Sequence, residues 1–148
     1  LTIISDLQLG PDVTSATAAR LVIEDGAKLK INATLTLDAE RGIRVSGLGT
    51  IEVASGFTAT YNGTISGANA SSGLVKTGAG TLVLGGAHSY SGNTDIQAGV
   101  LAVNGSLADA TTVKVAQGAT YQLNTSDTVA GIEGAGSITS GAITSTDE

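Results

Sequence analysis

The sequence predicts an all-β fold, a parallel β-helix (β-solenoid) with about 19–22 residues in each coil and roughly seven coils. Three observations lead to this prediction. Apolar residues come in pairs at positions i and i+2, the pairs recur at a nearly constant spacing, and glycines recur with them. Glycine accounts for 21 of the 148 residues, against a single proline. Because parallel crossovers are almost always right-handed, we expect a right-handed coil.

In the first half of the chain the spacing is 22 residues. The recurring pairs are Leu21/Ile23, Ile43/Val45 and then Ile65; Leu29/Ile31 and Ile51/Val53; Leu35/Leu37 and Phe57/Ala59. Each pair is typical of a short strand with one buried face. The shared spacing predicts that equivalent strands of successive coils lie side by side, about 4.8 Å apart.

In the second half the spacing shortens to 19 or 20 residues. The pairs are Leu82/Leu84, Leu101/Val103 and Tyr121/Leu123; Thr94/Ile96, Val113/Val115 and then Ile132, accompanied by Gly80, Gly99, Gly118 and Gly136. A β-sandwich also has short strands between turns, but it does not require one spacing to be shared by different strands. The register predicts that Phe57 and Tyr121 point inward and that Tyr61 and Tyr90 are the surface rings.

Composition and charge argue against several classes of protein. Seven basic and thirteen acidic residues give a net charge of −6, and the basic residues form no cluster, so we expect no binding of nucleic acid. Without cysteine the chain has no disulfide or thiolate metal site. No apolar run approaches the ~20 residues of a membrane-spanning helix, so we expect no membrane insertion of this segment. We also expect no cofactor.

One stretch resembles a known family. Residues 73–84 read GLVKTGAGTLVL, residues 88–94 read HSYSGNT, and residues 98–105 read AGVLAVNG. Together they resemble the passenger-associated transport repeat of bacterial autotransporters (type V secretion), with a Lys-Thr-Gly-x-Gly-Thr-Leu strand, an Asn-Thr-Tyr-Thr-Gly corner and an Ala-Gly-Thr-Leu strand. His88 stands where Asn is usual, and Ser91 and Val100 stand where Thr is usual. The residues carrying the motif are Lys76, Thr77, Gly78, Gly80, Leu82, Leu84, Tyr90, Gly92, Gly99, Leu101 and Val103.

The resemblance implies a secreted protein at the bacterial cell surface. We expect residues 1–148 to be one β-helical fragment of a longer passenger, with the transport repeat at 73–107 and a last coil at 128–148 that caps the helix or frays. The implied partners are a translocator barrel, C-terminal on the same polypeptide, and the outer-membrane assembly machinery. The implied role is a non-catalytic, monomeric stalk whose folding outside the cell promotes secretion. The alternative is an adhesin flank that binds host glycans or self-associates between cells.

An enzyme acting on polysaccharides is the third and least favoured possibility. His88, Ser89 and Asp95 lie close together in sequence, but adjacent residues in one turn point in different directions, so we expect no catalytic triad. His88 is interpreted as a surface residue at a corner, and Tyr90 as a ring that covers a corner with its hydroxyl in solvent. Asp38, Glu40, Arg41 and Arg44 are interpreted as a polar loop before a strand. We expect no catalytic, cofactor-binding or metal-binding residues.

Overall fold

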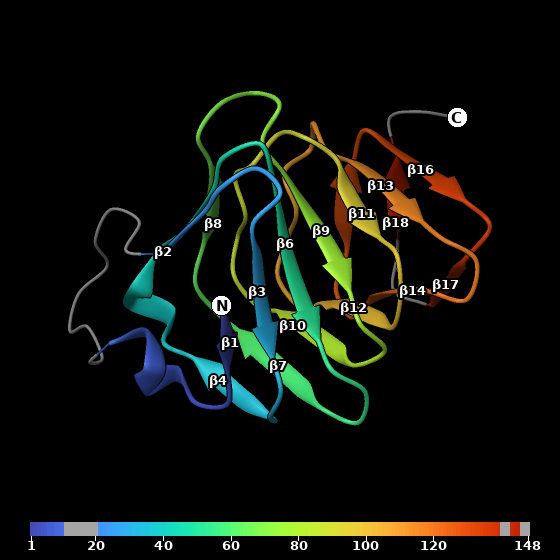
Figure 1. Ribbon diagram of the computed structural model, residues 1–148. Helices are drawn as coiled ribbons and strands as arrows, with labels where there is room; N and C mark the ends of the chain where they lie inside the picture. The colour runs from blue at the N-terminus through green and yellow to red at the C-terminus, as the bar shows by residue number, and fades with distance from the viewer. Residues whose placement is uncertain (11–20, 140–142, 146–148) are drawn as a thin grey trace.

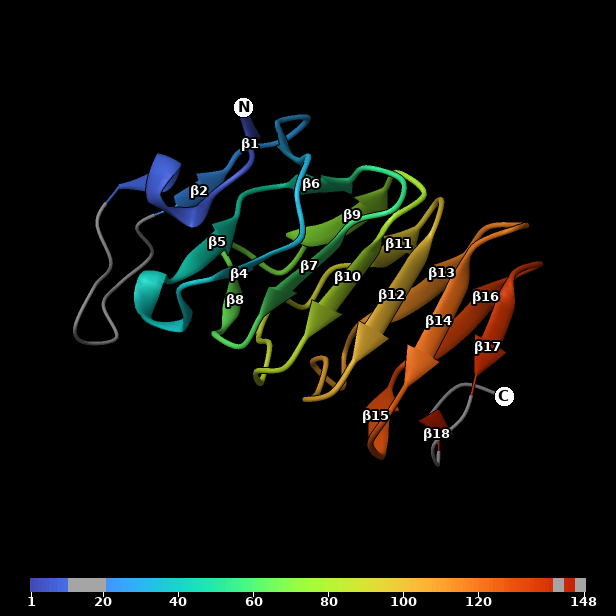
Figure 2. The ribbon, with the colours of Figure 1, turned by 90° about the horizontal axis from the view of Figure 1, so that it is seen from below.

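The computed structural model describes residues 1–10, 21–139 and 143–145, and it confirms an all-β parallel solenoid. The chain winds around three walls, and every strand pairs in parallel with strands of neighbouring coils (Figures 1 and 2). The helices in this part of the chain are two short 3₁₀ turns, η1 (Asp6–Leu9) and η2 (Ala39–Arg41). Neither is long and apolar enough to cross a membrane.

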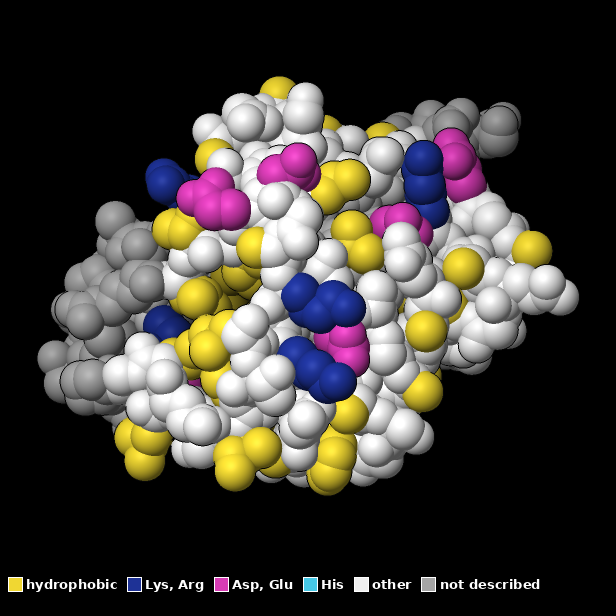
Figure 3. Space-filling model, in the orientation of Figure 1, with side chains coloured by type: hydrophobic (Ala, Val, Ile, Leu, Met, Phe, Trp, Pro, Cys, Tyr) yellow, Lys and Arg dark blue, Asp and Glu magenta, His cyan; other side chains and the backbone are white. Residues whose placement is uncertain are grey.

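The first wall is a seven-stranded sheet, seen face-on in Figure 1. Its strands, in spatial order, are β1 (Thr2–Ile3), β3 (Lys28–Ile31), β6 (Leu48–Val53), β9 (Gly73–Thr77), β11 (Thr94–Ile96), β13 (Thr112–Val115) and β16 (Gly131–Gly134). The outer face of this wall gathers charged side chains (Figure 3). At its centre, Glu52 pairs with Lys28 at 2.7 Å and with Lys30 at 3.3 Å.

The second wall is a six-stranded sheet that faces the viewer in Figure 2. Its strands are β4 (Leu35–Leu37), β7 (Thr58–Tyr61), β10 (Thr81–Leu84), β12 (Val100–Val103), β14 (Thr120–Leu123) and β17 (Ser137–Thr139). No residue of these six strands is charged. The two broad walls of the solenoid therefore differ in the chemistry of their outer faces.

The third wall is interrupted in the middle. It begins as a three-stranded sheet of β2 (Leu21–Ile23), β5 (Ile43–Val45) and β8 (Ile65–Gly67). It ends as a two-stranded sheet of β15 (Asp127–Val129) and β18 (Ile143–Ser145). Between them the chain passes along this side twice, in residues 85–93 and 104–111, without forming a strand. The two passages share an isolated bridge between Ala87 and Ser106. We call this region the third-wall gap.

The register confirms most of the predicted pairings. Leu29 pairs with Ile51, Leu82 with Leu101, and the pairs of the third wall follow the predicted spacing of 22 residues. The prediction for the second wall is wrong at one step, because Leu35 pairs with Ala59 rather than with Phe57. The turn after β6 is longer than the turn after β3, which shifts the pairing by two residues. Phe57 consequently lies in the turn and is 37% exposed.

The solenoid has about five full turns rather than roughly seven, since the six strands of the second wall are separated by five passages of the chain. The first turn is long: Ile3 pairs with Ile31, which is 28 residues further on. The steps in the first half of the second wall, such as Leu35 to Ala59, are also longer than expected. The interior is a largely aliphatic column with three tyrosines, because most strands direct alternate residues inward. The last strand of the second wall, β17, is an exception and is exposed along its length.

Candidate functional site

The segment from β9 to β12 stacks its core residues directly on one another. Leu82 pairs with Leu101 and Leu84 with Val103, and all four side chains are fully buried. Truncation of a buried leucine in such a column is expected to cost about 2–5 kcal/mol. The four motif residues that were predicted as strand cores therefore lie in one continuous apolar stack, which joins neighbouring coils of the second wall.

Lys76 occupies a core position. It pairs with Ile51 on one side and with Ile96 on the other, so its side chain lies in a row of inward-pointing aliphatic residues on the first wall. The residue is completely buried. Since Leu74, two positions earlier, also points inward, Lys76 follows the same alternation. A long side chain is needed here because the ammonium group must reach the corner at the end of the strand.

The Lys76 ammonium group binds three backbone carbonyl oxygens at this corner. Its Nζ donates to the carbonyls of Thr77 and Gly78 at 2.8 Å each, and to that of Ala98, on the next coil, at 3.1 Å. Burial lowers the pKa of Lys76 to about 8, and the negative charge of Glu52 opposes that shift. The three carbonyls also favour the charged form. Lys76 therefore fastens one coil to the next through polar contacts inside an apolar core.

Two motif glycines make this corner possible. Gly78 has φ +77° and Gly99 has φ +68°, both in the left-handed region that favours glycine. A Cβ atom at Gly78 would collide with the carbonyl oxygen of Val53, and one at Gly99 with that of Gly80. The glycines thus provide both the backbone conformation and the close approach of neighbouring coils. A substituted side chain could satisfy neither requirement without moving the backbone.

A chain of hydroxyl groups fills the interior beside the third-wall gap. The Tyr90 hydroxyl lies 2.8 Å from Thr94 Oγ1, which lies 3.0 Å from Thr111 Oγ1 on the next coil. Thr111 donates in turn to the carbonyl oxygen of Gly92 at 2.6 Å. Tyr90 is fully buried, so the prediction of a solvent-exposed hydroxyl is wrong. Tyr90 lies in the irregular segment 85–93, and its ring packs into the core.

The predicted surface rings are therefore both buried. Tyr61 is 1% exposed and donates to the carbonyl oxygen of Thr64 at 3.2 Å, while Tyr90 is 0% exposed. Tyr121 points inward, as predicted. Phe57 is the one aromatic ring with substantial exposure, which is the reverse of its predicted position. The shifted register of the second wall explains both Phe57 and Tyr61.

His88 is buried as well, and the prediction of a surface histidine is wrong. It is 4% exposed, and its Nδ1 accepts a hydrogen bond from the backbone N–H of Ile65 at 3.0 Å. Ser89 is exposed, whereas Asp95 lies on the outer side of β11 and accepts a hydrogen bond from Gln97. These three side chains do not converge, and the catalytic arrangement that their sequence proximity suggested does not form.

The predicted polar loop is a structural link. The Arg41 guanidinium, 2% exposed, binds Asp6 through Nη2 at 2.6 Å and through Nε at 3.2 Å, and it donates to the carbonyl of Leu9 at 3.0 Å. Asp38 caps η2 by accepting a hydrogen bond from the Glu40 N–H at 3.0 Å. Arg41 thus ties η1 to η2, two segments more than thirty residues apart.

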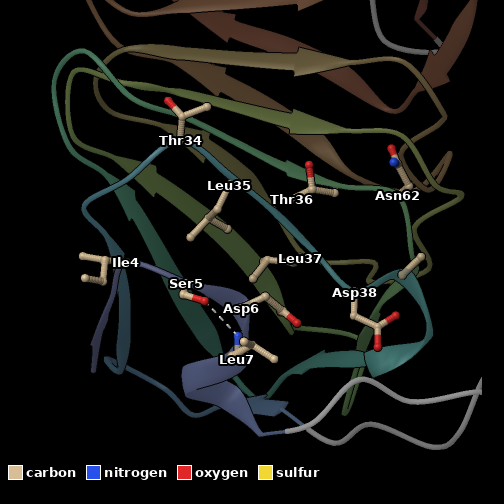
Figure 4. Close-up of a pocket in the computed structure, with 11 residues that line it drawn as sticks. Ile4, Ser5, Asp6, Leu7, Thr34, Leu35, Thr36, Leu37, Asp38 and Asn62 are labelled. Atoms are coloured by element: carbon tan, nitrogen blue, oxygen red, sulfur yellow. Dashed lines mark hydrogen bonds between the residues drawn. The ribbon is translucent and has the colours of Figure 1, made fainter.

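A groove of about 810 Å³ lies between η1 and β4 (Figure 4). Residues 4–7 line one side, and residues 34–39 with Asn62 line the other. Its two carboxylates, Asp6 and Asp38, are engaged with Arg41 and with the backbone of η2. No other ionisable side chain lines the groove. The part of the chain that the structure describes also holds no group of three acidic or histidine side chains that could bind a metal ion.

Sequence reasoning missed the internal polar contacts of Lys76, His88 and Tyr90. For Lys76 a signal was present, because the alternation with Leu74 directs it inward. For His88 and Tyr90 the signal is weaker, since an irregular corner has no periodicity to assign inward and outward positions. The remaining motif residues lie at or next to the corners: Thr77 is the last residue of β9, Gly80 directly precedes β10, and Gly92 precedes β11.

Comparison with known proteins agrees with these features. Residues 74–103 match the family of passenger-associated transport repeats. Over 102 residues, or 68% of this chain, the sequence is 38% identical to the adhesin BmaC autotransporter of Brucella suis biovar 1 (strain 1330). The chain spans about 3% of the length of that relative. No solved structure matches significantly. These findings confirm the resemblance to autotransporter passengers and an extracellular location, tethered to the outer membrane or released from it.

Proposed function

Because the chain is an autotransporter-type passenger segment with a transport repeat, we propose that it is a non-catalytic stalk whose folding promotes secretion. In this proposal the segment from β9 to β12 folds outside the cell, helps to draw the passenger across the outer membrane, and holds a functional head away from the surface. A translocator on the same polypeptide and the outer-membrane assembly machinery are the partners. The observation that carries the proposal is the uninterrupted core stack of the repeat, with Lys76 fastening successive coils.

The experiment compares core variants with surface variants in the full-length passenger. Leu82→Ala and Leu101→Ala each remove side-chain volume from a fully buried position, and each should cost about 2–5 kcal/mol of a total stability of about 5–15 kcal/mol. Asp95→Ala and Glu40→Ala, which alter partly exposed side chains, serve as controls. Surface display should fall for the core variants only. Equal display of all four, with the core variants less stable in isolation, would show that folding of this segment does not drive transport.

An adhesive flank is the second candidate. It is favoured by one observation, the broad second wall with no charged residue, whose outward positions carry threonines such as Thr36, Thr60 and Thr120. Glycan binding usually needs exposed aromatic rings, and of the four rings only Phe57 is substantially exposed. We therefore propose that the segment has no sugar-binding platform. As part of the stalk proposal, we also propose that it is a monomer. Saturable binding of the chain to cells or glycans, abolished by Thr60→Lys but not by Thr50→Lys on the first wall, would favour the adhesin instead.

A further inference from the structure

The third-wall gap leaves backbone groups without strand partners, and side chains replace them. The N–H of Ile65 in β8 faces the gap, and its acceptor is His88 Nδ1 on the next coil, 3.0 Å away. The backbone on either side of this contact is also bonded across coils. Ser89 N–H donates to the Ile65 carbonyl at 2.9 Å, and His88 N–H donates to the Ser106 carbonyl at 2.9 Å. His88 thus joins three successive coils at the point where the sheet ends.

This contact requires the neutral imidazole. Nδ1 can accept a hydrogen bond only through its lone pair, so the proton of the neutral ring is on Nε2. Protonation would place an N–H at both ring nitrogens, and the Nδ1 proton would then point at the Ile65 N–H. His88 Nε2 is buried and has no hydrogen-bond partner among the described residues, so the ring is not held by a second contact. In the described part of the chain, the protonated ring would find no acceptor at either nitrogen.

Two coils further along the solenoid, the equivalent contact uses a different side chain. The N–H of Leu107 donates to Asp127 Oδ2 at 3.0 Å, and Thr128 N–H donates to Asp127 Oδ1 at 3.0 Å. A carboxyl group keeps an acceptor oxygen whether or not it is protonated, whereas a histidine does not. Burial raises the pKa of Asp127, so acidification through that pKa favours the folded chain. The two contacts therefore respond to acid in opposite directions.

We propose that His88 is an acid-sensitive clamp, which holds the corner of the transport repeat against β8 at neutral pH and releases it when the imidazole is protonated. The ionisable neighbours are few. β8 carries none, the segment 104–111 carries the exposed Asp109, and the ring of Tyr90 lies 6.4 Å from the imidazole ring. Burial alone accounts for the lowered pKa of His88, about 4 against an ordinary value of 6.5. No carboxylate is placed to stabilise the imidazolium among the contacts of the described residues.

The direction of the pH effect follows from linkage. The folded chain binds the His88 proton less tightly than the unfolded chain does. The contribution of His88 to the folding stability is therefore complete above pH 6.5, and it is lost as the pH falls from 6.5 towards 4. For these two pKa values, the folding equilibrium constant should fall about thirtyfold between pH 7.5 and pH 5.0 through this residue alone. Other groups titrate in the same interval, so a matched variant is needed.

His88→Asn is that variant. The asparagine Oδ1 occupies nearly the same place as Nδ1, accepts a hydrogen bond and does not titrate, and asparagine is the usual residue at this position of the repeat pattern. The experiment measures urea unfolding of both chains at pH 7.5 and 5.0. We expect the two chains to have similar stability at pH 7.5. Between pH 7.5 and pH 5.0, the folding equilibrium constant of the wild type should fall about thirtyfold more than that of His88→Asn. An equal loss in both chains would overturn the proposal.

A direct titration provides an independent test that needs no variant. The imidazole resonances of the wild-type chain, followed by NMR from pH 7.5 to 4, should show the Nε2–H tautomer and a pKa well below 6.5. The Ile65 amide resonance should shift with the same midpoint. A pKa near 6.5, or an Ile65 amide that does not respond, would show that His88 does not clamp the corner.

Discussion

Replacement of Lys76 by methionine tests whether a buried ammonium group stabilises the repeat. Methionine keeps the length and the apolar stem of the side chain but removes all three N–H donors, so the carbonyl oxygens of Thr77, Gly78 and Ala98 lose their partner. The protein is otherwise unchanged, because the stem already lies in the aliphatic row between Ile51 and Ile96. The substitution therefore isolates the polar contacts at the corner.

Two opposing contributions determine how much stability the Lys76→Met substitution should remove. A hydrogen bond to a charged group contributes about 1.5–3 kcal/mol, and Lys76 makes three of them. Against this, burial of the ammonium costs about 3 kcal/mol, as judged from the fall of its pKa from 10.5 to about 8. The net loss of stability in Lys76→Met at pH 7 should therefore be about 1.5–6 kcal/mol. Lys114→Met, which alters an exposed lysine on the same wall, should change the stability by less than about 0.5 kcal/mol.

Chemical denaturation at several pH values is the assay. The pKa of Lys76 is lower in the folded chain than in the unfolded chain, so the unfolded chain holds more protons between pH 8 and 10.5. The stability of the wild type should rise with pH in this window relative to Lys76→Met, by up to about 3 kcal/mol. If Lys76→Met is as stable as the wild type at pH 7, the carbonyl contacts contribute nothing, and the reasoning is refuted.

The remaining predictions concern the corners. Gly78→Ala should destabilise the fold more than Gly118→Ala in thermal melts, because both glycines have positive φ but only Gly78 lies against a neighbouring carbonyl; equal losses would show that strain alone matters. Tyr90→Phe should cost about 1–2 kcal/mol by removing the bond to Thr94, as measured in urea, and a neutral effect would contradict the hydroxyl chain. Because burial raises the pKa of Tyr90, ultraviolet titration should show that this hydroxyl does not ionise at pH 10 in the folded chain.

The strands could be predicted from the sequence, because inward residues alternate along a strand and the spacing between coils is nearly constant. Leu82 and Leu101 show this directly. The spacing of the apolar pairs does not reveal how long each turn is. The two-residue shift in pairing that exposes Phe57 and buries Tyr61 could therefore not be predicted. The polar contacts of the site were largely missed for a related reason. His88 and Tyr90 belong to a corner without a strand period, and only the folded chain shows that this corner turns inward.

The pairing of each strand with its neighbours one coil away also determines how the chain can be assembled in time. Leu82 meets Leu101 after 19 residues, and Leu101 meets Tyr121 after 20. A short loop closes at a modest cost in entropy, and each completed coil presents an edge on which the next can form. A chain released gradually from a narrow opening can therefore begin to fold once about two coils are free, and each later coil adds to a template that already exists.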